Sequence, residues 1–231
     1  MQKHYLVTGA SSGIGYKTSE ILAQNNSRVI VIARTESALK ELESSFPDQI
    51  KALALDITDE KSVDEIIHYL TDEGRKLDGI VHNAGLLIAK PFKELTQQDW
   101  QRQLDVNLLA PVLITRKLLD HLNKNAHILN ISSMGGYMGS SKFPGLSAYS
   151  ASKGALSILT ECLTAELSDS DIKCNCLCLG AVQTEMLETA FPGMQAPVSA
   201  DEMGGYVADF LMNGHKFYNG KILPVALADP S

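Results

Sequence analysis

The stretch "TGASSGIG", Thr8 to Gly15, decides the fold of this 231-residue chain. It follows the short apolar run "HYLVT" at 4–8, typical of a buried strand, and precedes residues 13–25, whose apolar side chains recur at helical spacing. Its glycines therefore belong to a tight turn between a strand and a helix. A helix N-terminus offers unpaired N–H groups and a partial positive charge, which suit a pyrophosphate. The turn predicts a dinucleotide site, and a glycine turn without a ligand is the alternative.

Strand-like and helix-like segments alternate along the rest of the chain. The pattern predicts strands at 4–8, 28–33, 50–56, 77–85, 126–133, 172–180 and 220–227, and helices at 13–25, 36–46, 62–72, 96–122, 148–168 and 201–212. Wholly apolar strands are covered on both faces, as in a parallel sheet with helices on each side. Right-handed crossovers then give a doubly wound α/β sheet. Without repeats or linkers, residues 1–231 are expected to form a single domain.

Composition narrows the classes of partner. The net charge is −7 and no Lys/Arg cluster stands out, which argues against nucleic acid. No apolar run reaches the roughly 18 residues of a membrane span. The N-terminus enters a strand at once, without the apolar region of a secretory signal. We therefore expect a cytoplasmic protein with no nucleic-acid or membrane partner.

Three of the four cysteines form the pattern "CNCLC", Cys174 to Cys178. On a strand this period of two puts them on one face. The spacing lacks the usual C-x₂-C of metal sites, and free cysteine is often buried. The pattern favours core packing over metal or redox work, and we expect no metal.

The stretch "AYSASK" places Tyr149 and Lys153 four residues apart, on one face of the helix expected there. A phenol has a pKa of about 10, and a neighbouring ammonium group lowers it. A tyrosine tuned in this way can give or take a proton at a reacting oxygen. The alternative is a lysine stem lying over an aromatic ring.

With these motifs in order, the chain resembles the short-chain dehydrogenase/reductase family over essentially its whole length. The motifs are "TGASSGIG", "HNAG" at 82–85 with His82 in place of the family's first Asn, "DVNLLAP", "NISS" and "YSASK". The resemblance implies a Rossmann-type fold and NAD(P)-dependent interconversion of an alcohol and a carbonyl compound. It implies the catalytic residues Ser133, Tyr149, Lys153 and Asn107. It implies a cofactor site of Gly9, Ser11, Ser12, Gly13, Ile14, Gly15, Arg34, Asp56, Ile57, Asn83, Ala84, Gly85, Tyr149, Lys153, Gly180, Val182 and Thr184.

The resemblance also implies a role for each catalytic residue. Ser133 would orient the substrate oxygen and Tyr149 would pass a proton to or from it. Lys153 would hold the nicotinamide ribose and, together with the cationic oxidised nicotinamide, lower the pKa of the tyrosine. Pro111 has no N–H and lies four residues after Asn107, so the Asn107 carbonyl lacks its helical partner. This carbonyl could hold a water beside Lys153, the role that the family gives to its Asn. An incidental kink is the alternative.

Two departures from the family pattern bear on the site. Ser133 lies 16 residues before Tyr149, farther than is usual in the family, so the loop 134–147 is expected to be longer. Leu179 replaces the proline that usually precedes Gly180, so the family pattern does not predict the backbone conformation at this point.

The turn "ART" at 33–35 bears on the choice of cofactor. An acid after the second strand binds the 2′-OH of NAD, whereas an arginine accommodates the 2′-phosphate of NADP. Position 33 is alanine and Arg34 offers a planar fork for phosphate, so NADP is preferred to NAD, with Glu36 nearby as the counter-argument. Asp56 is expected to meet the adenine.

The expected activity is reduction of a small carbonyl compound. The alternative is a non-catalytic NADP-binding redox sensor, which would have no use for an intact catalytic set. An epimerase or dehydratase would want a larger C-terminal region.

We expect apolar substrate walls without a cation for an anionic substrate. The walls are expected from Met186, Leu187, Phe191 and Met194 on one side, and from Met134, Tyr137, Met138 and Phe143 on the other. The apolar stripes of the helices 96–122 and 148–168 favour a homotetramer or homodimer.

Overall fold

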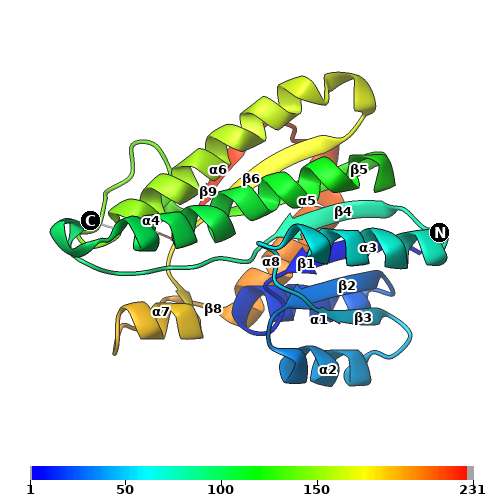
Figure 1. Cartoon of the computed structure of the whole chain (residues 1–231), viewed down its shortest axis with the longest axis horizontal. Coiled ribbons are helices and arrows are strands. Elements are labelled where there is room, and N and C mark those ends of the chain that lie inside the picture. Colours follow the sequence, from blue (N-terminus) through cyan, green and yellow to red (C-terminus); the bar gives the residue numbers. More distant parts are fainter. Residues whose placement is uncertain (1, 228–231) are drawn as a thin grey trace.

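A seven-stranded parallel sheet forms the centre of the computed structural model, which describes residues 2–227 (Figure 1). The strand order is β3-β2-β1-β4-β5-β6-β9. The strands are β1 His4–Thr8, β2 Arg28–Ala33, β3 Ile50–Ala54, β4 Leu77–His82, β5 Leu122–Ser133, β6 Lys173–Leu179 and β9 Ile222–Val225. The order reverses between β1 and β4, where open α/β sheets bind their ligands. The expected doubly wound sheet is confirmed.

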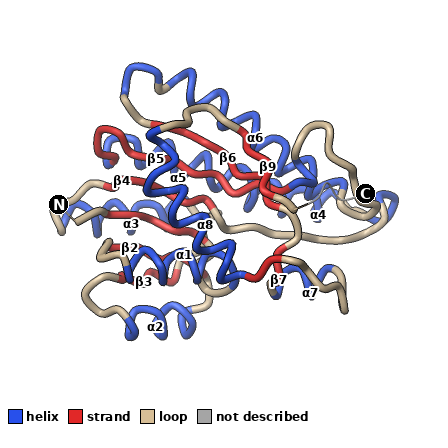
Figure 2. The backbone as a smooth tube through the Cα atoms, turned by 180° about the vertical axis from the view of Figure 1, so that it is seen from behind, coloured by secondary structure: helices blue, strands red, loops and turns tan. Residues whose placement is uncertain are grey.

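Helices cover both faces of the sheet, which Figures 1 and 2 show from opposite sides. One face carries α1 Gly13–Gln24, α2 Glu36–Ser45 and α8 Ala200–Asn213, and the other α3 Glu60–Asp72, α4 Gln97–Leu104, α5 Ala110–Leu118 and α6 Ser147–Glu166. Successive residues of β1 point to opposite faces of the sheet: Val7 packs in the core under α1, α2 and α8, and Leu6 packs in the core on the other face. This double burial explains the wholly apolar strands.

Small elements complete the chain beyond the carboxyl ends of the strands. A two-stranded sheet of β7 Val182–Gln183 and β8 Val198–Ser199 brackets α7 Glu185–Ala190. Short 3-10 turns are η1 Phe92–Glu94, η3 Leu119–His121, η4 Met134–Gly136, η5 Ser168–Ser170 and η6 Gly214–Lys216.

The long helix expected at 96–122 is not continuous. It consists of α4, a π-helical turn η2 at Asp105–Leu109, α5 and η3. The Ala110 N–H donates to the Asp105 carbonyl, five residues back. Pro111 supplies no N–H to the carbonyl four residues before it, and a wider turn accommodates that missing donor. The expected continuous helix is therefore interrupted by a π-helical turn that contains Asn107.

Other boundaries differ by a few residues. Strand β5 begins at Leu122 rather than 126, through a pairing of Leu77 with Leu122 that is out of register with the rest of its ladder. Strands β3 and β9 end earlier than expected, at Ala54 and Val225.

The three cysteines of "CNCLC" are buried free thiols on one face of β6. Cys174 packs in the core cluster under α3, α5 and α6, and Cys176 and Cys178 pack against Met134. The expected core packing is confirmed. Among residues 2–227, no helix is long and apolar enough to cross a membrane.

Candidate active site

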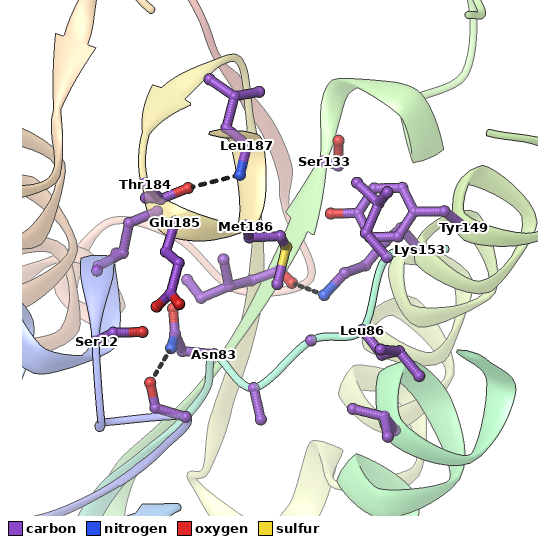
Figure 3. A pocket seen from close by; sticks show the side chains of 18 of the residues that line it. Ser12, Asn83, Leu86, Ser133, Tyr149, Lys153, Thr184, Glu185, Met186 and Leu187 are labelled. Carbon is purple, nitrogen blue, oxygen red and sulfur yellow. Dashed lines mark hydrogen bonds between the residues drawn. The ribbon is translucent and has the colours of Figure 1, made fainter. Parts of the chain in front are cut away.

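A cavity of about 660 Å³ opens at the carboxyl ends of the central strands (Figure 3). It is lined by nearly all the residues that the sequence predicted for the site: Gly9, Ser11, Ser12, Gly13, Ile14, Arg34, Asp56, Ile57, Asn83, Ala84, Gly85, Ser133, Tyr149, Lys153, Gly180, Val182 and Thr184. Gly15 and Asn107 are the two that do not line it. The fold thus gathers residues from every predicted motif around one space.

The glycines of the first turn have distinct roles. Gly9 and Gly13 adopt φ values of 69° and 57°, in the region that favours glycine. A Cβ atom on Gly9 would lie 2.7 Å from the Ala84 Cα. Gly15 lies behind the cavity, where a Cβ would come within 2.3 Å of the Gly9 carbonyl oxygen, so it permits close packing of α1.

The N-terminus of α1 fits a bound diphosphate. Ser12 is the N-cap, yet its side chain makes no capping hydrogen bond, and the first turn carries no acidic residue. The hydroxyl and the first N–H groups can therefore serve an anionic ligand. Glu185, an exposed residue of α7, lines the same cavity, and a diphosphate bound there would repel its carboxylate (Figure 3).

Asn83 and Ala84 fasten the "HNAG" segment to the glycine turn. The Asn83 side-chain amide donates to the carbonyls of Thr8 (3.0 Å) and Gly9 (3.1 Å). The Ala84 N–H donates to the Thr8 hydroxyl at 3.1 Å. These bonds connect β1 and β4 at the point where the strand order reverses.

At the far end of the cavity, Arg34 is exposed and lacks an ion-pair partner among the described residues, whereas the nearby acids are engaged. Glu36 pairs with Lys40 at 2.6 Å and does not line the cavity. Asp56 accepts hydrogen bonds from the Thr58 backbone (2.9 Å) and hydroxyl (2.7 Å). These bonds lower the pKa of Asp56, with a smaller contribution from Arg34.

Ser133 and Tyr149 lie side by side at the opposite end (Figure 3). Tyr149 is 9% exposed, and burial raises the pKa of its phenol to about 12, against a hydrogen bond with Ser133 that acts the other way. Lys153 is not among the causes of this shift, so the lowering of the Tyr149 pKa by Lys153 together with an oxidised nicotinamide stays a prediction. The Lys153 ammonium donates to the Ile131 carbonyl at 2.8 Å, and burial lowers its own pKa to about 8. A protonated phenol suits the role of acid.

Asn107 is fully buried behind the cavity wall, and its side chain is fully used. The Leu86 N–H donates to Oδ1 at 2.8 Å, and Nδ2 donates to the Leu86 carbonyl and the Ser152 hydroxyl, both at 2.9 Å. The Ser152 hydroxyl donates to the Tyr149 carbonyl at 2.7 Å. Asn107 therefore links the wall to the helix that carries Tyr149, and the availability of its backbone carbonyl stays a prediction.

Neither departure from the family pattern disrupts the site. Leu179 pairs with Val225 in a regular strand, and the Gly180 N–H continues the ladder to the Val225 carbonyl at 2.9 Å. In the longer loop, Met134, Phe143 and Leu146 line the cavity.

The substrate walls were predicted only in part. Met186, Leu187, Phe191 and Met194 line the cavity as expected. Tyr137 and Met138 do not, because the loop turns outward there and Met138 is 85% exposed. Sequence reasoning missed Leu86, Leu87 and Arg102, which come from segments without a recognisable motif. It also missed Asp105 and Val106, although they open the "DVNLLAP" motif, because only Asn107 of that motif was expected at the site.

Comparison with known proteins identifies the class that this fold and site define. A family model described as short chain dehydrogenase matches residues 3–195, and the chain belongs to this family. It is 35% identical over 188 residues to a 3-amino-tetrahydro-pyrrolizinone reductase of Xenorhabdus hominickii, covering 79% of this chain and 63% of that protein. It is 30% identical over 209 residues to a cyclopentanol dehydrogenase of Comamonas testosteroni, covering 88% and 81%.

Solved structures agree on the fold. A 3-ketoacyl-(acyl-carrier-protein) reductase of Brucella melitensis, complexed with NADH, superimposes with a TM-score of 0.88 at 27% identity. The match covers 97% of this chain and 96% of that one. The expected Rossmann-type fold of the family is confirmed.

Proposed function

We propose that the protein reduces a small, neutral carbonyl compound to an alcohol with NADPH, or runs the reverse reaction. The observation that carries this proposal is the placement of Ser133, Tyr149 and Lys153 at one end of a cavity whose other residues fit a dinucleotide. A redox sensor on the same fold would not need a buried phenol beside a serine hydroxyl.

The chain's own residues supply binding, orientation and a proton. Ser133 donates a hydrogen bond to the substrate oxygen and orients it. Tyr149 gives its phenolic proton to that oxygen, and a nicotinamide held in the cavity would supply the hydride. Lys153 lies in the same end of the cavity, where its ammonium can hold the nicotinamide ribose and favour the phenolate left after proton transfer.

The preference for NADP rests on Arg34. Its guanidinium is exposed at the adenosine end of the cavity, whereas Glu36 does not line the cavity. The Brucella protein in complex with NADH supports a nicotinamide dinucleotide as the cofactor class. The diphosphate would lie over Ser12 and Gly13.

The substrate class follows from the walls. Leu86, Leu87, Leu187, Phe191 and Met194 are apolar, so a neutral ketone or aldehyde fits best. Arg102 lines the cavity, which corrects the expectation that no cation is available there. We place it at the exposed rim, where water screens its charge.

A cytoplasmic homo-oligomer, tetramer or dimer, is part of the proposal. The two helical regions that were expected to pack against a second copy, 96–122 and 148–168, each carry an exposed apolar side chain: Leu109 is 47% exposed and Ile158 is 51% exposed. Leu156 and Leu163 pack instead toward the sheet.

The test is cofactor consumption by the purified chain with NADPH or NADH and a panel of matched neutral and anionic ketones and aldehydes. The proposal predicts a higher kcat/KM with NADPH and with the neutral member of each pair. It is wrong if cofactor binds and no carbonyl or alcohol compound is converted.

A further inference from the structure

The segment that follows "HNAG" shows a regular alternation of hydrogen bonds. Every second N–H group is held by the protein: Ala84 by the Thr8 hydroxyl at 3.1 Å, Leu86 by Asn107 Oδ1 at 2.8 Å, Ile88 by Gln103 Oε1 at 3.0 Å and Lys90 by the Gly145 carbonyl at 3.1 Å. Among the described residues, the N–H groups that lie between these four make no such hydrogen bond.

The side chains of Gln103 and Asn107 accept the hydrogen bonds that the backbone carbonyls of a neighbouring strand would otherwise accept. Gln103 and Asn107 are four residues apart, a rise of about 6 Å along a helix. Leu86 and Ile88 are two residues apart, about 6.6 Å along an extended chain. The two spacings match, so successive side chains can hold successive N–H groups. Gln103 is fully buried, and its Nε2 also donates to the Asp99 carbonyl at 3.3 Å.

The opposite edge of this segment is open. Within residues 2–227, the N–H and carbonyl groups of Gly85, Leu87 and Ala89 make no hydrogen bond. Successive residues of an extended chain direct these groups to opposite sides. Gly85 and Leu87 line the cavity, and a Cβ on Gly85 would lie 3.5 Å from the Lys153 ammonium. The open edge therefore begins at the reacting end and continues to Leu87.

We propose that the backbone of Leu87 is a subsite for a secondary amide in the substrate. The Leu87 N–H donates to the amide carbonyl, and the Leu87 carbonyl accepts from the amide N–H, as when an extended ligand adds to a strand edge. A substrate that displaces water from this edge has to satisfy both groups. The proposal rests on the proposed reduction and narrows its substrate to carbonyl compounds that carry such an amide.

The distance from the reacting end sets the shape of the probe. Leu87 is two residues beyond Gly85, about 6.6 Å along an extended chain. An amide whose nitrogen lies about five bonds from the ketone carbon spans this distance. The matched probes are N-butyl 5-oxohexanamide and butyl 5-oxohexanoate, in which the ester has an oxygen in place of the amide N–H.

The wild-type chain is expected to use the amide with a kcat/KM at least about fivefold above that of the ester, the value of one hydrogen bond. Leu87→Pro removes the N–H but suits an extended position, and Leu87→Ala is its control because it keeps the N–H. The proline variant is expected to lose about tenfold on the amide relative to the alanine variant. The Kd for NADPH is expected to stay within about twofold in both.

Equal kcat/KM for the amide and the ester in the wild type overturns the subsite, as does a proline variant equal to the alanine variant. If neither ketone is reduced although NADPH binds, the proposed reaction fails and the subsite is judged by binding alone. The probe is then N-butyl 5-hydroxyhexanamide, titrated while the Leu87 amide signal is followed by NMR. A shift that saturates at a lower concentration with this amide than with the matching hydroxy ester supports the subsite, and no saturable shift, or equal affinities, overturns it.

Discussion

Replacing Arg34 with alanine tests whether this residue binds the 2′-phosphate of NADP. A hydrogen bond to a charged group contributes about 1.5–3 kcal/mol when sheltered. Arg34 is exposed, so solvent reduces its contribution to roughly 1–2 kcal/mol. Since 1.4 kcal/mol is a factor of about ten, Arg34→Ala is expected to weaken NADPH binding roughly 5- to 30-fold. NADH lacks the 2′-phosphate, so its Kd is expected to change by less than about twofold.

The assay is quenching of protein fluorescence by NADPH and NADH in both proteins. Arg102→Ala is the matched control, because it removes the same charge from the other end of the same cavity. It is expected to leave both Kd values nearly unchanged. An unaltered ratio of the two Kd values in Arg34→Ala would show that Arg34 does not bind the 2′-phosphate, and the assignment of NADP would lose its basis.

Three further predictions concern stability and assembly. Gln103→Met leaves the Ile88 N–H without its partner and is expected to lower the free energy of unfolding, measured in urea titrations, by about 1–3 kcal/mol. Gln98→Met, on the exposed face of the same helix, is the control and is expected to change it by less than about 0.5 kcal/mol. Equal effects of the two substitutions would contradict the role of Gln103. Burial lowers the folded-state pKa of His82 to about 3 and of His127 to about 4, so as the pH falls below 6.5, the ordinary pKa of histidine, the unfolded chain takes up protons before the folded chain does. Stability is then expected to fall by about 1.4 kcal/mol per pH unit for each of these two histidines as the pH drops from 6.5 toward 4, and His82→Asn is expected to remove its contribution of about 1.4 kcal/mol per pH unit. A slope that persists unchanged in this variant would refute the assignment. Light scattering is expected to give a multiple of 25.1 kDa, and a monomer at micromolar concentration would count against the predicted oligomer.

The fold could be predicted because its signals are local. Wholly apolar strands alternate with amphipathic helices, and the glycine turn at Thr8–Gly15 can form in only a few ways. The missing N–H donor at Pro111 was readable from the sequence, but the break of the helix at 96–122 into α4, a π-helical turn and α5 was not predicted. The early start of β5 depends on pairing with Leu77, which no local pattern announces.

The site was predictable where a motif carries it and not elsewhere. Tyr149 and Lys153 stand out by their spacing, but the environment that raises the phenol's pKa is built from the tertiary structure. Arg102 and Leu87 come from segments without a motif, and only the fold brings them to the cavity. The support that Gln103 gives to Ile88 likewise depends on how α4 packs.

The central claim is that the Tyr149 phenol is the proton donor. The most direct measurement is single-turnover reduction of a ketone with saturating bound NADPH, in the wild type and in Tyr149→Phe. The phenylalanine ring preserves the buried packing, so the fold and the Kd for NADPH are expected to stay normal. The rate is expected to fall at least about 100-fold, the usual contribution of general acid catalysis. A Tyr149→Phe variant that folds, binds NADPH and reduces the ketone at nearly the wild-type rate would contradict the account.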